Sequence, residues 1–194
     1  MDAGGTTPMT RLMIVAASVR EGRIGLPIAQ WVLREAEADG RFEIDFADLK
    51  EIALPLMDEP NHPRLRQYTR DHTKAWSARV DAAEAFVFVQ PEYNYSYAPS
   101  LKNALDYLHQ EWRRKPVGTV SYGGISGGTR GVTALRPVEQ ALGLVPTSAN
   151  VELAWAAQQI DDEGVFQPRE SNERMLHTQF DELIALSAAL SPLR

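Results

Sequence analysis

The stretch that decides the fold of this chain is AFVFVQPEYNYSYAPSLKNALDYL, residues 85–108. It begins with an apolar run, rich in aromatic and β-branched side chains, that is too short for a helix and predicts a strand buried on both faces of a parallel sheet. Pro91 ends this strand, and a loop rich in tyrosine follows. Pro99 then opens a helix whose leucines recur on one face. In an open parallel sheet, this order places the loop at the carboxyl edge of a central strand, where ligands bind.

The loop itself predicts the kind of ligand. Its residues Glu92, Tyr93, Asn94, Tyr95 and Tyr97 offer backbone N–H groups, an amide side chain and flat aromatic rings. These groups suit a planar heterocycle with a polar rim, so a flavin is the first candidate.

A second ligand loop follows the first predicted strand, residues 11–17. The segment SVREGRIG, residues 18–25, leads into a helix, and the free N–H groups and dipole of a helix start favour a phosphate. Ser18, Arg20 and Arg23 add hydrogen-bond donors. The loop lacks the glycine patterns of P-loop and dinucleotide-binding proteins, so it suits a single phosphate. The alternative is an ordinary strand–helix turn with solvated arginines.

A third loop, GGISGGT at residues 123–129, is dense in glycine, which lets the backbone pass close to a ligand. It also raises a competing hypothesis, because residues 124–128 match the Gly-x-Ser-x-Gly nucleophile elbow of a hydrolase. Ser126 would then be the nucleophile, with Asp161 or Asp162 and His177 following in the order of a hydrolase triad. Against this reading, His177 lies in a predicted helix, and no oxyanion-loop pattern is present.

The whole pattern alternates strands and helices. It predicts a doubly wound α/β fold with helices on both faces of a five-stranded parallel sheet, of flavodoxin-like order 2-1-3-4-5. The expected strands span residues 11–17, 42–49, 85–90, 117–122 and 144–153, the last one broken at Pro146. Gly40 and Gly143 are expected to end two of the helices, and Pro137 is expected to kink or divide the second of them.

Length and composition set further limits. A chain of 194 residues with 44% hydrophobic residues predicts one domain, residues 11–194, after a disordered tail at residues 1–10. The chain has no cysteine, which excludes disulfides, thiolate metal sites and cysteine nucleophiles, and its four histidines show no metal-ligand spacing.

Charge and hydropathy exclude two classes of partner. The net charge of −6 gives no basic face for nucleic acid. The apolar run at residues 12–17 is too short to span a membrane and lacks a basic flank. We therefore expect a cytoplasmic enzyme with small-molecule partners.

Three of these motifs, PEYNYSYAPSLKNALDYL, SVREGRIGLPIA and SYGGISGG, resemble the NADPH-dependent FMN reductases, a family of flavodoxin-like fold that includes quinone, azo-dye and chromate reductases. The three loops occur in the family's order and cover most of the chain. One departure is Ala17, at a position where the family usually has glycine.

The resemblance implies an enzyme that passes hydride from NADPH or NADH through bound FMN to a quinone, flavin, azo compound or similar acceptor. FMN carries the chemistry, so no catalytic side chain is required. The Ser18 loop would take the phosphate, and the backbone N–H groups of Glu92 to Tyr95 would hold the ring system. Tyr95 and Tyr97 would shape the acceptor pocket, or alternatively pack between subunits.

The residues expected to contact the cofactor are Ser18, Arg20, Arg23, Ile24, Gly25, Pro91, Glu92, Tyr93, Asn94, Tyr95, Ser121, Gly123 and Gly124. A homodimer or homotetramer is implied by the resemblance alone. A flavodoxin-type electron carrier, which would bind FMN without reacting with nicotinamide, is the alternative, although the phosphate loop does not match the longer Ser/Thr-rich loop of flavodoxins.

Overall fold

A parallel β-sheet forms the centre of the computed structural model, which describes residues 9–194. Its strands are β1 (Thr10–Ala16), β2 (Phe42–Asp48), β3 (Ala85–Pro91), β4 (Pro116–Gly123), β5 (Val145–Pro146) and β6 (Val151–Ala154). Their order is β2-β1-β3-β4-β5, and β6 also pairs with β4. This confirms the predicted order. The fifth strand is divided into two short segments, as expected for a strand interrupted by proline.

The predicted tail needs one correction. Residues 1–8 of that tail lie outside the described residues. Thr10, however, is already the first residue of β1 and pairs with Phe42 of β2. The ordered structure therefore begins before the predicted boundary at residue 11.

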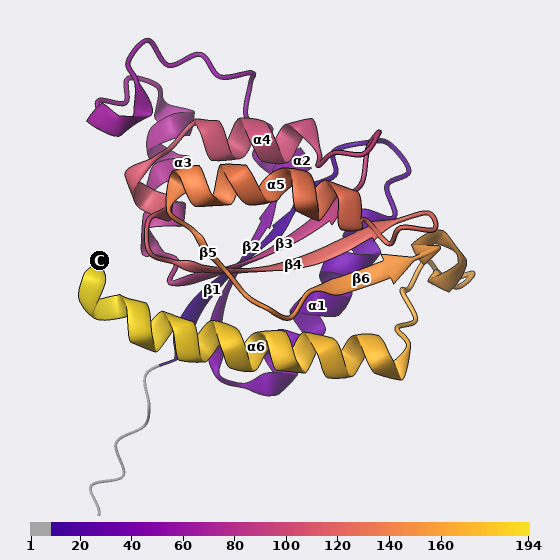
Figure 1. The fold of residues 1–194 in the computed structure, drawn as a ribbon. Helices are drawn as coiled ribbons and strands as arrows, with labels where there is room; N and C mark the ends of the chain where they lie inside the picture. Colours follow the sequence, from indigo (N-terminus) through magenta and orange to yellow (C-terminus); the bar gives the residue numbers. More distant parts are fainter. Residues whose placement is uncertain (1–8) are drawn as a thin grey trace, which may run out of the picture.

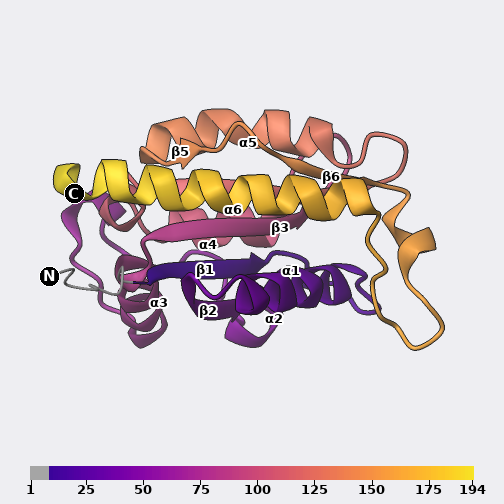
Figure 2. The same ribbon diagram turned by 90° about the horizontal axis from the view of Figure 1, so that it is seen from below.

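Helices cover both faces of the sheet (Figure 1). They are α1 (Gly25–Asp39), α2 (Leu49–Ile52), α3 (Asp71–Ala82), α4 (Pro99–Asp106), α5 (Thr129–Leu142) and α6 (Glu170–Leu190), with 3₁₀ turns η1 (Pro63–Leu65), η2 (Gln110–Trp112), η3 (Ala156–Gln159) and η4 (Ser191–Leu193). On one face, α1 packs mainly on β1 and β2, while α6 runs along β4 and β6 (Figure 2). Helices α3, α4 and α5 cover the other face.

The central strand β3 is buried along its whole length, as its sequence predicts. Its alternate side chains enter two different cores. Val87 and Val89 pack with α1 and α6, whereas Phe86 and Phe88 pack with α3, α4 and α5. Fully burying a side chain of this size contributes about 1.5–3 kcal/mol. A strand that contributes to both cores fixes the position of the loop that follows it.

Glycine ends two of the helices where the sequence predicts. Gly40 and Gly143 adopt left-handed conformations, with φ of 74° and 72°, directly after α1 and α5. Of the two outcomes predicted at Pro137, a kink or a division into two helices, the division is wrong, because α5 continues as one helix through that residue. Leu135 and Leu142 are buried in the core on either side of Pro137, and this packing offsets the cost of the lost backbone hydrogen bond.

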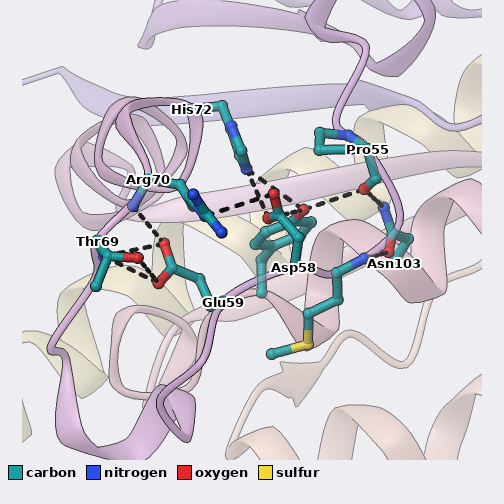
Figure 3. Close-up of polar contacts among 9 residues, drawn as sticks. Pro55, Asp58, Glu59, Thr69, Arg70, His72 and Asn103 are labelled. Carbon is teal, nitrogen blue, oxygen red and sulfur yellow. Dashed lines mark hydrogen bonds and ion pairs between the residues drawn. The ribbon is translucent and has the colours of Figure 1, made fainter.

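A long segment, residues 53–70, projects beyond α3 and α4 (Figure 1) and is held by side-chain contacts. The Glu59 carboxylate accepts hydrogen bonds from the backbone N–H groups of Thr69 and Arg70, at 2.9 and 2.8 Å (Figure 3). Asp58 Oδ1 lies 2.9 Å from His72 Nε2. These contacts close the segment on itself and on α3, so a connection with little regular structure keeps one conformation.

Candidate functional site

The loops after β1 and β3 meet at one edge of the sheet. Because β1 and β3 are paired in parallel, with Ala16 opposite Val89, their carboxyl ends lie side by side. The hydroxyl oxygens of Ser18 and Tyr93 lie 2.9 Å apart. The two loops that the sequence predicts as ligand loops are therefore in direct contact.

Ala17 does not disturb this arrangement. Its N–H donates to the Val89 carbonyl at 2.9 Å, which extends the β1–β3 pairing by one residue. The Ala17 side chain is fully buried and packs in the core on the α3–α5 face of the sheet. A methyl group in place of the usual glycine is thus accommodated on the core side.

A cleft of about 450 Å³ opens between the loops after β1, β3, β4 and β6. The cleft is lined by Ser18, Arg20, Gly22, Arg23, Ile24, Pro91, Glu92, Tyr93, Tyr122, Gly123, Gly124, Trp155, Ala157 and Gln158. Nine of these residues are among those expected from the sequence. A cleft at the carboxyl edge of a doubly wound sheet, between strands whose connections leave in opposite directions, is where this class of fold binds ligands.

The start of α1 in this cleft has unsatisfied hydrogen-bond donors. Ile24, the residue before the helix, makes no capping side-chain bond, and the first turn contains no acidic residue. Among the described residues, none accepts a hydrogen bond from a backbone N–H of residues 18–24. Uncapped N–H groups and the positive end of the helix dipole together favour an anion at this position.

Tyr122 brings a further donor to the same place. Its side chain is buried, with 4% of the residue exposed, and its hydroxyl has no partner among the described residues. A Cβ built on Gly25 would lie only 2.1 Å from this hydroxyl, so the glycine leaves the space that Tyr122 occupies. Because an unpaired buried hydroxyl costs about 1–3 kcal/mol, a ligand that accepts from Tyr122 would recover that free energy.

The two arginines of the first loop differ in their environment. Arg23 donates to the Ser18 carbonyl at 2.6 Å and forms a bidentate pair with Asp48, at 2.6 and 2.5 Å. Arg23, which the sequence predicts as a donor to the phosphate, is therefore already paired with a carboxylate at the end of β2. Arg20 is exposed, with its guanidinium 5.9 Å from the Tyr93 ring centre.

The loop after β3 contains a tight turn. Tyr93 and Ser96 exchange two backbone hydrogen bonds of 2.8 and 2.9 Å, and Asn94 and Tyr95 between them have φ of 49° and 68°. Two adjacent left-handed residues other than glycine cost roughly 1–3 kcal/mol each, and such strain is concentrated at functional sites.

Of the four backbone N–H groups that the sequence assigns to the ligand, two are already bonded to other groups within residues 9–194 and two are not. The N–H of Glu92 donates to the Tyr122 carbonyl at 2.9 Å, and the N–H of Tyr93 donates to Ser96. These two groups are already used within the protein, which corrects that part of the expectation. The N–H groups of Asn94 and Tyr95 have no acceptor among the described residues.

The glycine-rich loop after β4 lies close to its neighbours. Gly128 has φ of 92°, and a Cβ there would lie 2.7 Å from the Ser121 Cβ and 2.8 Å from the Tyr122 nitrogen. Ser121 is fully buried, and its hydroxyl donates to the Gly127 carbonyl at 2.9 Å. Through this hydrogen bond, Ser121, which is expected to contact the cofactor, holds the loop against the end of its own strand.

Some expected residues lie outside the cleft lining. Gly25 lies beneath Tyr122, and Asn94 and Tyr95 are exposed at the tip of their turn. Tyr97 packs against the core of the α3–α5 face, so the structure does not place it with Tyr95 in one pocket.

Sequence reasoning missed five residues of the cleft lining, Gly22, Tyr122, Trp155, Ala157 and Gln158. Tyr122 is the residue before the last one of β4, and Trp155 directly follows β6. The carboxyl ends of parallel strands share one edge. The position of Tyr122 and Trp155 in the strand pattern was therefore the signal that could have identified them.

The hydrolase reading does not fit the arrangement of its three groups. The Ser126 hydroxyl donates to Glu92 at 2.9 Å. His177 on α6 pairs with Glu35 of α1 at 3.3 Å, and Asp161 accepts from Gln167 and Val165 in its own turn. Ser126 has no histidine base, so it is not an activated nucleophile.

Residues 9–194 contain neither a metal cluster nor a membrane-spanning helix. No group of three or more histidine, aspartate or glutamate side chains is arranged there to hold a metal ion. None of the helices in that part of the chain combines the length and the hydrophobicity that a bilayer-spanning helix needs.

The chain has a flavodoxin-like α/β fold, with a cleft at the carboxyl edge of the sheet beside the uncapped start of α1. The model of the family "NADPH-dependent FMN reductase" matches residues 10–158, which is most of the chain. The chain belongs to this family of FMN- and NAD(P)H-dependent oxidoreductases.

Curated relatives agree with this assignment, and a solved structure shows the same fold. An NAD(P)H-dependent FMN reductase of Schizosaccharomyces pombe is 42% identical over 61% of this chain and 60% of its own length. Another from Nectria sp is 33% identical over 77% of each chain. The flavoenzyme NAD(P)H:(acceptor) oxidoreductase FerB of Paracoccus denitrificans superposes with a TM-score of 0.72 over 95% of this chain and 98% of its own, at 18% identity, which shows the shared fold.

Proposed function

We propose that this chain binds FMN in the cleft at the carboxyl edge of the sheet and transfers electrons from NADPH or NADH to a small oxidised acceptor. The observation that carries the proposal is the buried, unpartnered hydroxyl of Tyr122 beside the uncapped start of α1. A phosphate monoester, which FMN has, supplies the acceptor oxygens that this set of donors lacks. Residues 11–194 would act as one FMN-binding domain, since both cores share a single sheet.

The residues divide by their chemistry into two ends of one site. The phosphate would be held by Ser18, Arg20, Tyr122 and the backbone N–H groups of residues 20–25. The ring system would be flanked by Pro91, Tyr93, Gly123 and Gly124. The N–H groups of Asn94 and Tyr95 would donate to its polar edge. Ile24 borders the phosphate end, and Arg23 fixes the loop through Asp48.

Bound FMN would supply the hydride chemistry, and the chain would supply binding, orientation and electrostatics. The strained Asn94–Tyr95 turn keeps two N–H donors fixed before the ligand arrives, so no reorganisation is needed on binding. Trp155, half exposed beside Gly124, gives the cleft an aromatic wall.

The choice of acceptor rests on relatives. A probable NADPH:quinone oxidoreductase of rice is 33% identical over 71% of this chain, and an FMN-dependent NADPH-azoreductase of Staphylococcus saprophyticus is 26% identical over 58%. We propose a quinone or azo compound as the acceptor for this chain. Steady-state rates with a quinone, an azo dye and free flavin, each with NADPH and NADH, would rank the acceptors and the donors.

Two measurements test the binding site and the reaction. Fluorescence titration with FMN should give a Kd that Tyr122→Phe raises about tenfold or more, while the same substitution stabilises the unliganded protein by about 1 kcal/mol. Equal FMN affinities would refute the phosphate site. Anaerobic mixing of the FMN-loaded protein with NADPH should bleach the flavin absorbance; a persistent yellow colour would support the electron-carrier alternative.

Assembly and location complete the proposal. We propose a homodimer or homotetramer, supported by the exposed apolar side chains of Leu56, Met57 and Leu65, which are 86%, 39% and 59% exposed. Light scattering at micromolar concentration should give a molecular mass that is a multiple of 21.6 kDa, and Leu56→Lys should shift the mass toward that of the monomer.

The absence of cysteine agrees with a cytoplasmic location, which cell fractionation would test.

A further inference from the structure

Glu92 is a buried carboxylate at the edge of the cleft, and its partners come from the loop after β4 and from the first turn of α5. Only 7% of its side chain is exposed. Oε2 accepts from the Ser126 hydroxyl at 2.9 Å and from the Arg130 N–H at 3.1 Å, and Oε1 lies 2.6 Å from an Arg130 guanidinium nitrogen. Gly128, the residue before α5, has no side chain to cap that helix. Glu92 therefore caps α5 from a different element.

The charge state of Glu92 follows from these partners. Burial alone would raise its pKa, but the Ser126 hydroxyl and the Arg130 guanidinium outweigh burial and hold the pKa of Glu92 below its ordinary value. The group is an anion at neutral pH. A buried anion beside a ligand site matters, because charges interact strongly where water is excluded.

Arg130 connects this carboxylate to the strained turn. Its guanidinium carbon lies 3.9 Å from the ring centre of Tyr95, a cation–π contact, while 39% of the Arg130 side chain remains exposed. Tyr95 is itself 68% exposed and has φ of 68°. One arginine therefore contacts both a buried carboxylate and a residue held in a strained conformation.

We propose that Glu92 and Arg130 are positioning residues that form a matched charge pair: they balance the electrostatic potential at the flavin-binding cleft and hold the Asn94–Tyr95 turn. The inference rests on the proposed function. Reduction adds negative charge to the ring system of the flavin. An uncompensated charge at Glu92 or Arg130 therefore changes the affinity of the protein for reduced FMN relative to its affinity for oxidised FMN. In the intact pair, the effects of the two opposite charges on this relative affinity nearly cancel.

The test is the midpoint potential of the bound flavin in charge-removing variants. Glu92→Gln leaves the cation of Arg130 and should shift the potential in the positive direction. Arg130→Gln leaves the anion of Glu92 and should shift it in the negative direction. The double variant should return toward the wild-type value. Shifts of the same sign in both single variants, or no shift in either, would overturn the inference.

A matched control lies at the opposite edge of the sheet. Asp39, whose side chain is 6% exposed, forms a bidentate pair with Arg41 at the end of α1. Asp39→Asn removes a similarly buried carboxylate far from the cleft and should leave the potential unchanged. A shift as large as that of Glu92→Gln would show that the effect is not local, and would also overturn the inference.

Further measurements separate the possible failures. If a variant binds FMN weakly, the ratio of its dissociation constants for oxidised and reduced FMN, measured with excess FMN, reports the same shift. Arg130→Lys keeps the charge, so it should retain the wild-type ratio even if its affinity falls severalfold; a ratio like that of Arg130→Gln would contradict the charge argument. Failure of the wild-type protein to bind FMN would instead refute the proposed function.

Discussion

The guanidinium of Arg23 and the carboxylate of Asp48 form a buried bidentate pair that joins the loop between β1 and α1 to the end of β2. Their side chains are 8% and 11% exposed, and their two hydrogen bonds measure 2.6 and 2.5 Å. Burial opposes the charge on Asp48, yet the pair with Arg23 holds the pKa of Asp48 below its ordinary value. The loop that begins α1 is thus anchored before any ligand binds.

Breaking this pair should destabilise the protein strongly. Asp48→Asn leaves the charge of Arg23 buried without a partner, and we expect a loss of about 3 kcal/mol in the free energy of unfolding, measured with urea. Asp106→Asn, at an exposed pair with Lys102, is the control and should cost less than about 1 kcal/mol. Equal losses in the two variants would contradict the role assigned to Asp48.

Glu59 should make stability depend on pH in the acid range. Burial opposes its charge, but hydrogen bonds from Thr69 and Arg70 lower the pKa of Glu59 to about 2. Because the pKa of Glu59 is lower in the folded protein than in the unfolded chain, its ionised form stabilises the fold at pH values above the ordinary pKa of 4.5. This stabilisation is lost as the pH falls toward 2. The difference in melting temperature between wild type and Glu59→Gln should therefore be largest near pH 6 and shrink toward pH 2. A difference independent of pH would contradict this assignment.

Gly128 should tolerate no side chain. Alanine there requires a left-handed residue and brings a Cβ within 2.8 Å of the Tyr122 backbone, so we expect a loss of about 2–4 kcal/mol on thermal or urea unfolding. Gly40→Ala is the control, since Gly40 has φ of 74° but no atom within 4 Å of the new Cβ, and should cost about 1–2 kcal/mol. The two variants separate steric contact from backbone strain.

Trp155 should contribute to FMN binding, because it is the half-exposed aromatic residue of the cleft. We expect Trp155→Ala to raise the Kd for FMN about 3- to 10-fold, the effect of losing an aromatic contact of about 0.5–1.5 kcal/mol. Trp155→Phe, which keeps a ring, should recover much of the affinity. An unchanged Kd in the alanine variant would place Trp155 outside the cofactor site.

The strand order and the meeting of the two ligand loops follow from local sequence. Residues 85–89 are apolar on both faces of the strand, which requires a central strand with helices on either side, and Pro99 restarts the chain as a helix. Once β1 and β3 are neighbours in a parallel sheet, Ser18 and Tyr93 must lie at the same edge. The run of hydrophobic residues is a local property, so it can be read without coordinates.

The partners of polar side chains depend on tertiary structure alone. Asp48 reaches Arg23 from 25 residues away, Ser126 and Arg130 reach Glu92 from 34 and 38, and nothing in the local pattern specifies these pairs. The same holds for Tyr122, whose hydroxyl is left unpaired only because Gly25 of another element makes room for it. Periodicity therefore determined the fold and the edge where a ligand binds, whereas the packing of distant segments decided which donors and charges face that ligand.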